Sequence, residues 1–142
     1  MNAIDANVLI YSVDDTELAK QRIADRLLDH LATGVEATII PAQAAVEYFA
    51  CLRKWENLGR HTRDVTQDHL GRLLDSFSII PASPAILSHS LELSSRYSLS
   101  HWDSLLLAAC IEAGVETLYS EDMQDGMTYD GVRVVNPFAL SG

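Results

Sequence analysis

Short apolar runs alternate with longer amphipathic segments along this chain, and the alternation predicts strands separated by helices. Apolar runs typical of buried strands lie at residues 1–4, 36–40, 78–80, 115–119 and 132–135. Between them, apolar positions recur at helical spacing over residues 16–33, 41–56, 62–77, 84–97 and 103–113, with a short helix or turn at 6–11. Such alternation favours parallel pairing with right-handed crossovers. It predicts an α/β fold, a three-layer sandwich whose central parallel sheet of four to five strands has helices on both faces.

The apolar stripes also predict which helix faces are buried. Residues 103–113 are apolar on nearly every side, which is typical of a helix enclosed within a domain, and Gly114 ends this helix. In the other helices the predicted buried positions are Ile23, Ala24, Leu27, Leu28 and Leu31, then Ala42, Ala45, Val46, Phe49 and Ala50, then Leu70, Leu73, Leu74 and Phe77, and finally Leu87 and Leu91.

Length and composition place the chain among ordinary globular proteins. With 142 residues, 48% hydrophobic and 21% charged, we expect one domain over residues 1–142. Cys51 and Cys110 lie within apolar helical runs, where a buried and inert thiol is the expected state. Because no leader pattern or membrane-length apolar run appears, we expect a cytoplasmic protein with no membrane association.

The charge balance by itself disfavours nucleic acid as a partner. The formal net charge is -10, and affinity for phosphate backbones comes mainly from lysine and arginine. However, Asp5 and Asp103 sit in or beside apolar sequence, where unpaired charges are costly. A bound cation would resolve this second conflict, whereas the net charge remains an argument against an RNA partner.

Each acid of interest also has a local structural explanation. Asp103 follows Ser100 at the spacing of a capping box, and Asp5 could form a turn with Asn7. Asp122 and Asp125 could be loop acids, and Glu47 a solvated helix residue.

Taken together, the acids point to a metal site. Parallel topology brings the ends of the first and fourth strands to one edge of the sheet, with two helix starts beside them. The acids that converge there are Asp5, Glu47, Asp103 and Asp122. Carboxylates so gathered repel one another unless a divalent cation is bound, and oxygen ligands select Mg²⁺ or Mn²⁺. The histidines show no metal-binding spacing; they are His30, His61, His69, His89 and His101.

Several fragments resemble the PIN-domain ribonucleases of the VapC toxin type. They are IDANVLIYSVD at residues 4–14, SHWDSLLLAACIEAG at 100–114, LYSEDMQDG at 118–126 and VVNPF at 134–138. By position, the resemblance assigns the catalytic and metal-binding roles to Asp5, Glu47, Asp103 and Asp122, and supporting roles to Asn7, Ser120 and Asp125. Glu47 lies in the loosest of the matching patterns.

The resemblance implies a Mg²⁺- or Mn²⁺-dependent endoribonuclease, the toxin of a toxin-antitoxin pair. It implies an RNA substrate, a cognate antitoxin protein and a homodimer. A basic segment is the candidate for RNA contact, with a solvated helix end as its alternative; it contains Arg53, Lys54, Trp55, Arg60, His61 and Arg63. Two other functions stay open, a non-catalytic metal-binding or interaction module and a phosphatase-like phosphoryl-transfer domain. The Asp5-Ala6-Asn7 sequence departs from the usual DxD of such phosphatases.

Overall fold

A mostly parallel sheet forms the centre of the computed structural model, which describes residues 1–139. The strand order within these residues is β3-β2-β1-β4-β6-β5, with β5 antiparallel to β6 and the other pairs parallel. The strands are β1 (Asn2–Ile4), β2 (Thr38–Pro41), β3 (Ser78–Ile80), β4 (Thr117–Tyr119), β5 (Thr128–Tyr129) and β6 (Val132–Val135). The five predicted strands are therefore confirmed, and the two-residue β5 is an addition.

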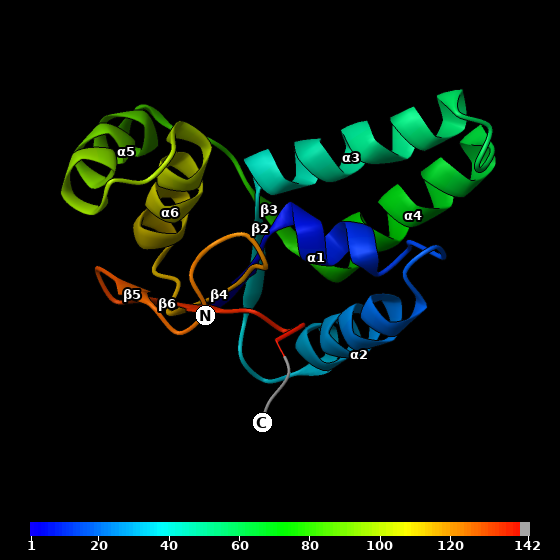
Figure 1. Cartoon of the computed structure of the whole chain (residues 1–142), viewed down its shortest axis with the longest axis horizontal. Helices are drawn as coiled ribbons and strands as arrows, with labels where there is room; N and C mark the ends of the chain where they lie inside the picture. Colours follow the sequence, from blue (N-terminus) through cyan, green and yellow to red (C-terminus); the bar gives the residue numbers. More distant parts are fainter. Residues whose placement is uncertain (140–142) are drawn as a thin grey trace.

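Helices cover both faces of this sheet. They are α1 (Ala6–Tyr11), α2 (Leu18–Thr33), α3 (Ala42–Asn57), α4 (Arg63–Ser76), α5 (Pro84–Tyr97) and α6 (His101–Ala113). Helices α1 to α4 pack on one face, whereas α5 and α6 form a separate pair on the other (Figure 1). The predicted three-layer α/β sandwich is confirmed. In the described residues, no helix is long and apolar enough to cross a membrane.

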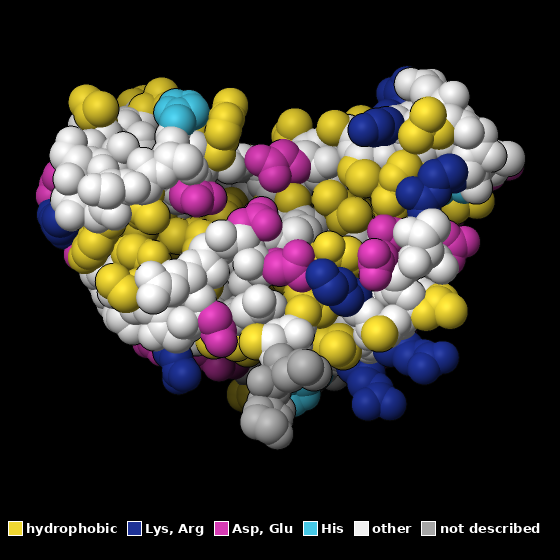
Figure 2. Space-filling model, in the orientation of Figure 1, with side chains coloured by type: hydrophobic (Ala, Val, Ile, Leu, Met, Phe, Trp, Pro, Cys, Tyr) yellow, Lys and Arg dark blue, Asp and Glu magenta, His cyan; other side chains and the backbone are white. Residues whose placement is uncertain are grey.

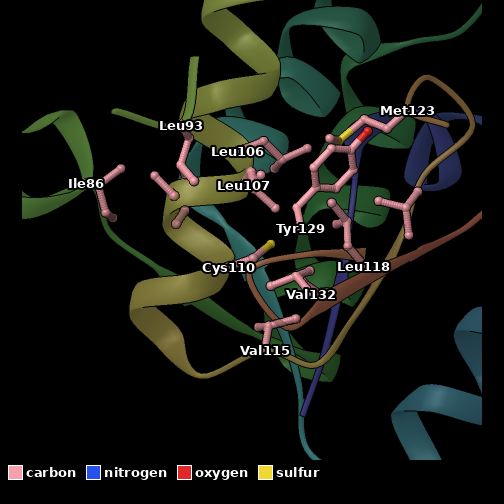
Figure 3. Close-up of a cluster of buried hydrophobic side chains, with 14 of the residues drawn as sticks. Ile86, Leu93, Leu106, Leu107, Cys110, Val115, Leu118, Met123, Tyr129 and Val132 are labelled. Carbon is pink, nitrogen blue, oxygen red and sulfur yellow. The ribbon is translucent and has the colours of Figure 1, made fainter. Parts of the chain in front are cut away.

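Strand side chains divide alternately between two hydrophobic cores. Ala3 and Leu118 belong to the core beneath α5 and α6, whereas Ile4 belongs to the core beneath α1 to α4. Successive residues of a strand point to opposite faces, which is why adjacent residues of β1 enter different cores. Figure 3 shows Leu107 and Cys110 of α6 lying close to strand side chains of the first core.

Helix α6 is the most enclosed helix of the described chain, as its sequence predicts. Its residues from Leu106 to Cys110 are each at most 7% exposed. Burial raises the pKa of the Cys110 thiol to about 12, which agrees with the expected inert cysteine. The helix ends at Gly114, whose φ of 79° lies in the left-handed region that glycine adopts without strain.

Two predicted helix faces are wrong. Helix α3 buries Ala44, Tyr48, Leu52 and Trp55, while Val46 is 66% exposed. This helix carries apolar residues on more than one side, and its packing against α1 and α4 selects the side that is buried. In α5, the predicted Leu87 and Leu91 are 59% and 75% exposed, and the buried positions are Ile86, Ser90 and Leu93.

The remaining stripes are partly right. Ala24 and Leu31 of α2 are buried as predicted, and so are Leu73 and Phe77 at the end of α4. Ile23 is 40% exposed and Leu74 is 55% exposed. These two residues stand at the edges of their stripes, where the neighbouring helices do not reach.

An ion pair joins the α3–α4 hairpin to the α1–α2 loop. A guanidinium nitrogen of Arg60 lies 3.1 Å from an Asp14 carboxylate oxygen, and the same oxygen accepts the backbone N–H and the hydroxyl of Thr16. Burial alone would raise the pKa of Asp14, but these hydrogen bonds outweigh it and lower the pKa below the usual 3.8. The Arg60 guanidinium also stacks 4.0 Å above the centre of the Trp55 ring.

We predict that Arg60→Met lowers the free energy of unfolding by about 1 kcal/mol at neutral pH. The pKa of Asp14 is lowered in the folded state, so its stabilisation is complete above 3.8 and is lost as the pH falls through the folded value. The difference in the free energy of unfolding between wild type and Arg60→Met should therefore shrink below about pH 3.8. The difference that remains at low pH is due to the lost contact between Arg60 and the Trp55 ring. Urea unfolding across this pH range measures it. Arg22→Met, on the exposed side of α2, is the control, and a difference that does not change with pH would contradict the prediction.

Candidate active site

Asp5 lies where β1 ends and α1 begins, and it is only 7% exposed. One of its carboxylate oxygens accepts the backbone N–H of Ala6 at 2.7 Å, which caps α1. The other accepts the Ser120 hydroxyl at 2.7 Å and the Asn7 side-chain amide at 3.3 Å. Asn7 contacts Asp5 through its side chain, so within residues 1–139 Asp5 acts as the N-cap of α1 and does not form the turn with the Asn7 backbone that the sequence suggested. The hydrogen bonds hold the carboxylate in one orientation.

Strand register explains why Ser120 reaches Asp5. β1 and β4 pair in parallel with Ile4 opposite Tyr119, so the next residue of each strand falls at the same edge. The Asp5 backbone N–H extends this ladder by donating to the Tyr119 carbonyl at 2.9 Å. Residues 115 apart in the chain thereby become neighbours.

The Asp5 carboxyl holds its proton unusually well. Burial raises its pKa to about 6, although hydrogen bonds from Ser120 and Ala6 favour the ionised form. The negative charges of Asp122 and Glu47 raise the pKa further, which places both carboxylates within electrostatic range of Asp5. A cation bound here would relieve this unfavourable charge.

Glu47 and Asp103 lie on two helices, α3 and α6, that a hydrogen bond joins. Glu47 lies on the exposed side of α3, with its carboxylate 3.5 Å from the Gln43 side-chain amide. The same amide donates to the backbone carbonyl of Trp102 at 3.1 Å, and this contact joins α3 to the start of α6. Gln43 is a contributor that the sequence pattern did not reveal.

The carboxylate of Asp103 is not used for helix capping. The Ser100 hydroxyl accepts the Asp103 backbone N–H at 3.1 Å, as in the first half of a capping box. In the second half the carboxylate would accept the backbone N–H of Ser100, and that bond is not formed. Within residues 1–139 no group donates a hydrogen bond to this half-buried carboxylate. It is therefore free to bind a ligand.

Asp122 and Asp125 follow β4 in an exposed loop and differ in their contacts. The backbone N–H of Asp122 donates to the Ser120 hydroxyl at 3.2 Å, and its side chain is exposed. The Asp125 carboxylate accepts the backbone N–H of Asn136 at 2.8 Å. Asp125 thus ties the loop to the end of β6, which is a structural contact.

The predicted acids do not form a closed cluster within the described residues. Figure 2 shows carboxylate side chains around the depression between α6 and α3. In the described part of the chain, no three His, Cys, Asp or Glu side chains are close enough together to hold a metal ion. The carboxylate oxygens and the raised pKa of Asp5 nevertheless fit the chemistry of a hard divalent cation. Binding would require the exposed acids to move toward Asp5.

The basic segment is mostly engaged in contacts within the protein. Trp55 is 8% exposed, so the expected stacking of a base on its ring does not fit the structure. Arg60 covers this ring and pairs with Asp14, while Arg53 and Arg63 pair with Glu56. His61 bonds to the Leu52 carbonyl and the Thr66 hydroxyl. Lys54 is exposed and makes no ion pair within residues 1–139.

A set of contacts that the sequence pattern did not reveal is made by Glu121, the residue before Asp122 in the chain. The Lys20 ammonium lies 2.8 Å from the Glu121 carboxylate, which also accepts the Tyr11 hydroxyl at 3.3 Å. One feature of the sequence could have indicated this contact. Lys20 lies in the first turn of α2, where the helix dipole disfavours a cation, so a negatively charged partner is expected.

Comparison with solved structures shows the same fold in bacterial toxins. A toxin-antitoxin complex from Klebsiella pneumoniae matches with a TM-score of 0.69 and 23% identity over 99% of this chain and 100% of that chain. VapC20 of Mycobacterium tuberculosis, described as a sarcin-ricin loop cleaving toxin, matches with a TM-score of 0.65 and 15% identity over 86% and 90%. FitAcB of Neisseria gonorrhoeae matches with a TM-score of 0.65 and 17% identity over 99% and 100%.

Comparison of sequences gives the family. No curated protein matches the chain significantly. The family model described as the PIN domain matches residues 3–124, a range that begins before Asp5 and extends beyond Asp122. The family resemblance seen in the sequence fragments is confirmed, and the chain belongs to the PIN domain family.

Proposed function

We propose that this protein is a Mg²⁺- or Mn²⁺-dependent endoribonuclease that acts as the toxin of a toxin-antitoxin pair. The observation that carries the proposal is the buried Asp5 carboxylate, whose pKa is raised to about 6 by burial and by nearby carboxylates at the edge of a PIN-domain sheet. The similar VapC20 toxin is described as cleaving the sarcin-ricin loop, which supports RNA as the substrate class.

In this proposal each residue has a defined task. Asp5 and Asp103 hold the divalent cation, with Glu47 and Asp122 completing its ligands. Ser120 and Asn7 orient the Asp5 carboxylate through the hydrogen bonds described above. When bound, the cation would lower the pKa of a water molecule and stabilise the charge on the phosphoryl group.

In this proposal the attacking nucleophile is water and not a side chain of the protein. Ser120 is completely buried and its hydroxyl donates to Asp5, so it serves as a positioning group. Burial also raises the pKa of the Cys51 thiol, as it does that of Cys110, which disfavours the reactive thiolate. Hydrolysis by water is therefore the mechanism we favour.

The acidic hollow and an adjacent apolar groove support the proposed protein partners. A groove of about 580 Å³ lies between α3 and the α5–α6 pair, where Val46, Leu87 and Trp102 are exposed. We assign this groove to a homodimer contact, because a lining that is apolar apart from Gln43 and Glu47 suits self-association of a chain with a net charge of -10. The acidic hollow would accept a basic side chain of the antitoxin.

We predict that Asp5→Asn and Asp103→Asn each reduce Mg²⁺-dependent RNA cleavage by at least about 100-fold, because an amide lacks the charge that holds the cation. Glu47→Gln should act in the same direction. The measurement is the initial rate on a labelled single-stranded RNA, with Asp75→Asn on exposed α4 as the control. Near wild-type rates for Asp5→Asn or Asp103→Asn would contradict the site. If the wild type binds metal but cleaves no RNA, a non-catalytic module is favoured. If it hydrolyses only phosphomonoesters, a phosphatase-like domain is favoured.

We predict that Mg²⁺ or Mn²⁺ raises the Tm of the wild type and that Asp103→Asn loses most of this increase. A ligand at about 100 times its Kd stabilises the folded state by roughly 2.7 kcal/mol, which thermal unfolding detects readily. Asparagine is also a favourable residue near helix starts, so Asp103→Asn should change the Tm little in the absence of metal. A lower Tm seen only in the presence of metal would therefore show that Asp103 binds the cation and does not merely stabilise the helix. Asp75→Asn should keep the full increase. Equal increases in wild type and Asp103→Asn would exclude Asp103 as an important ligand.

We predict that the antitoxin is a small protein with an amphipathic helix and a basic side chain that reaches the acids. Co-expression of the neighbouring small gene should relieve growth arrest and yield a stable complex. Because the basic group would lie near Asp103, the complex of Asp103→Asn should dissociate faster at low salt than that of wild type. Rescue of growth without any complex would contradict the prediction.

A further inference from the structure

Glu121 is tied to two helices although it lies in an exposed loop between two site residues. Its carboxylate accepts the Lys20 ammonium at 2.8 Å and the Tyr11 hydroxyl at 3.3 Å. Its backbone N–H donates to the Asn7 side-chain oxygen at 3.1 Å. These three contacts fasten the segment after β4 to α1 and to the first turn of α2.

From these contacts we propose that Lys20 is a positioning residue of the active site. By pairing with Glu121, it holds the loop after β4 so that Asp122 stays beside Asp5. The inference rests on the proposed function, because Asp122 is there a ligand of the cation. It goes beyond that function by giving a role to residues outside the acidic set.

Lys20 is itself held by more than a surface ion pair. Its ammonium lies 4.6 Å from the centre of the Tyr11 ring and 5.6 Å from that of Phe138, and these two rings meet edge to face at 5.0 Å. The side chains of Lys20 and Glu121 are only 35% and 26% exposed. An isolated exposed pair contributes little because its side chains move freely, whereas these several contacts restrict Lys20.

The position of Lys20 in its helix is unfavourable on local grounds. It is the third residue of α2, where the helix dipole repels a positive charge. The contact with Glu121, 101 residues away in the chain, compensates for this repulsion. Lys20 is thus unfavourable within its own helix, and its favourable charge interaction is with Glu121 in the loop after β4.

Asp122 depends on this attachment because it has few contacts of its own. Its side chain is exposed, and its backbone N–H is held by the Ser120 hydroxyl at 3.2 Å. Glu121 is the adjacent residue, and its side chain provides the ties to Lys20 and Tyr11. Loss of the Lys20 charge should therefore let Asp122 move away from Asp5 without unfolding the sheet.

The test compares Lys20→Met, which keeps the length of the side chain but removes its charge, with Lys20→Arg, which restores a cation. Arg26→Met removes a positive charge from an exposed position of the same helix and is the matched control. Hydrogen exchange of residues 120–125 in metal-free protein measures the loop directly. Cleavage kinetics with Mg²⁺ separate kcat from KM for RNA.

For Lys20→Met we expect exchange of the Glu121 and Asp122 amides to rise about 10-fold. We also expect kcat to fall by roughly 10- to 100-fold at an unchanged KM, which is the size of effect seen for groups that orient metal ligands. Lys20→Arg should restore most of both properties. In a Glu121→Gln background, Lys20→Met should have little additional effect, because the pair is already broken.

Other outcomes would overturn the proposal. A higher KM at unchanged kcat and unchanged exchange would show that Lys20 contacts the RNA phosphates instead. A lower Tm with normal kcat and normal loop exchange would make its role purely structural. If the wild type itself fails to cleave RNA with metal, the proposed function fails, while the exchange measurement still decides whether Lys20 holds the loop.

Discussion

The fold of the site depends on one buried carboxylate that joins three elements. Asp5 ends β1, caps α1 and accepts the Ser120 hydroxyl at the end of β4. A carboxylate with so little solvent is costly to ionise unless hydrogen bonds or cations compensate, and the pKa of about 6 shows that compensation is incomplete. The parallel register of β1 and β4 is what makes this arrangement possible, because it brings the two strand ends together.

The distribution of charge explains how so acidic a protein could act on RNA. Arginines that looked available in the sequence are engaged by neighbouring acids, as Arg60 is by Asp14 and Arg63 by Glu56. Asp103, by contrast, has no hydrogen-bond donor within residues 1–139, and burial and neighbouring carboxylates raise the pKa of Asp5. In the proposed reaction a divalent cation would reverse the sign of the field where the phosphate approaches.

The solved toxins that share this fold are at most 23% identical to the chain among those compared above. The conserved feature is thus the arrangement of layers, which rests on general hydrophobic patterning and tolerates many sequences. In the proposed function, activity depends instead on a few side chains at one edge of the sheet. The family is shown by the sequence match over residues 3–124, and the fold by itself does not fix a function.

The sequence by itself determined the order of strands and helices along the chain, the enclosed α6, and the positions of Asp5, Asp103 and Asp122 at or beside the ends of elements. These features follow from local periodicity and from glycine and proline signals, which act over a few residues. Tertiary structure decided which side of α3 is buried, because the helix has apolar residues on more than one side and only α1 and α4 select between them. It also decided two sets of contacts between residues far apart in the chain. Arg60, which covers the Trp55 ring, pairs with Asp14, and Lys20 pairs with Glu121. Long-range pairing leaves no trace in local periodicity, so only the folded chain reveals it.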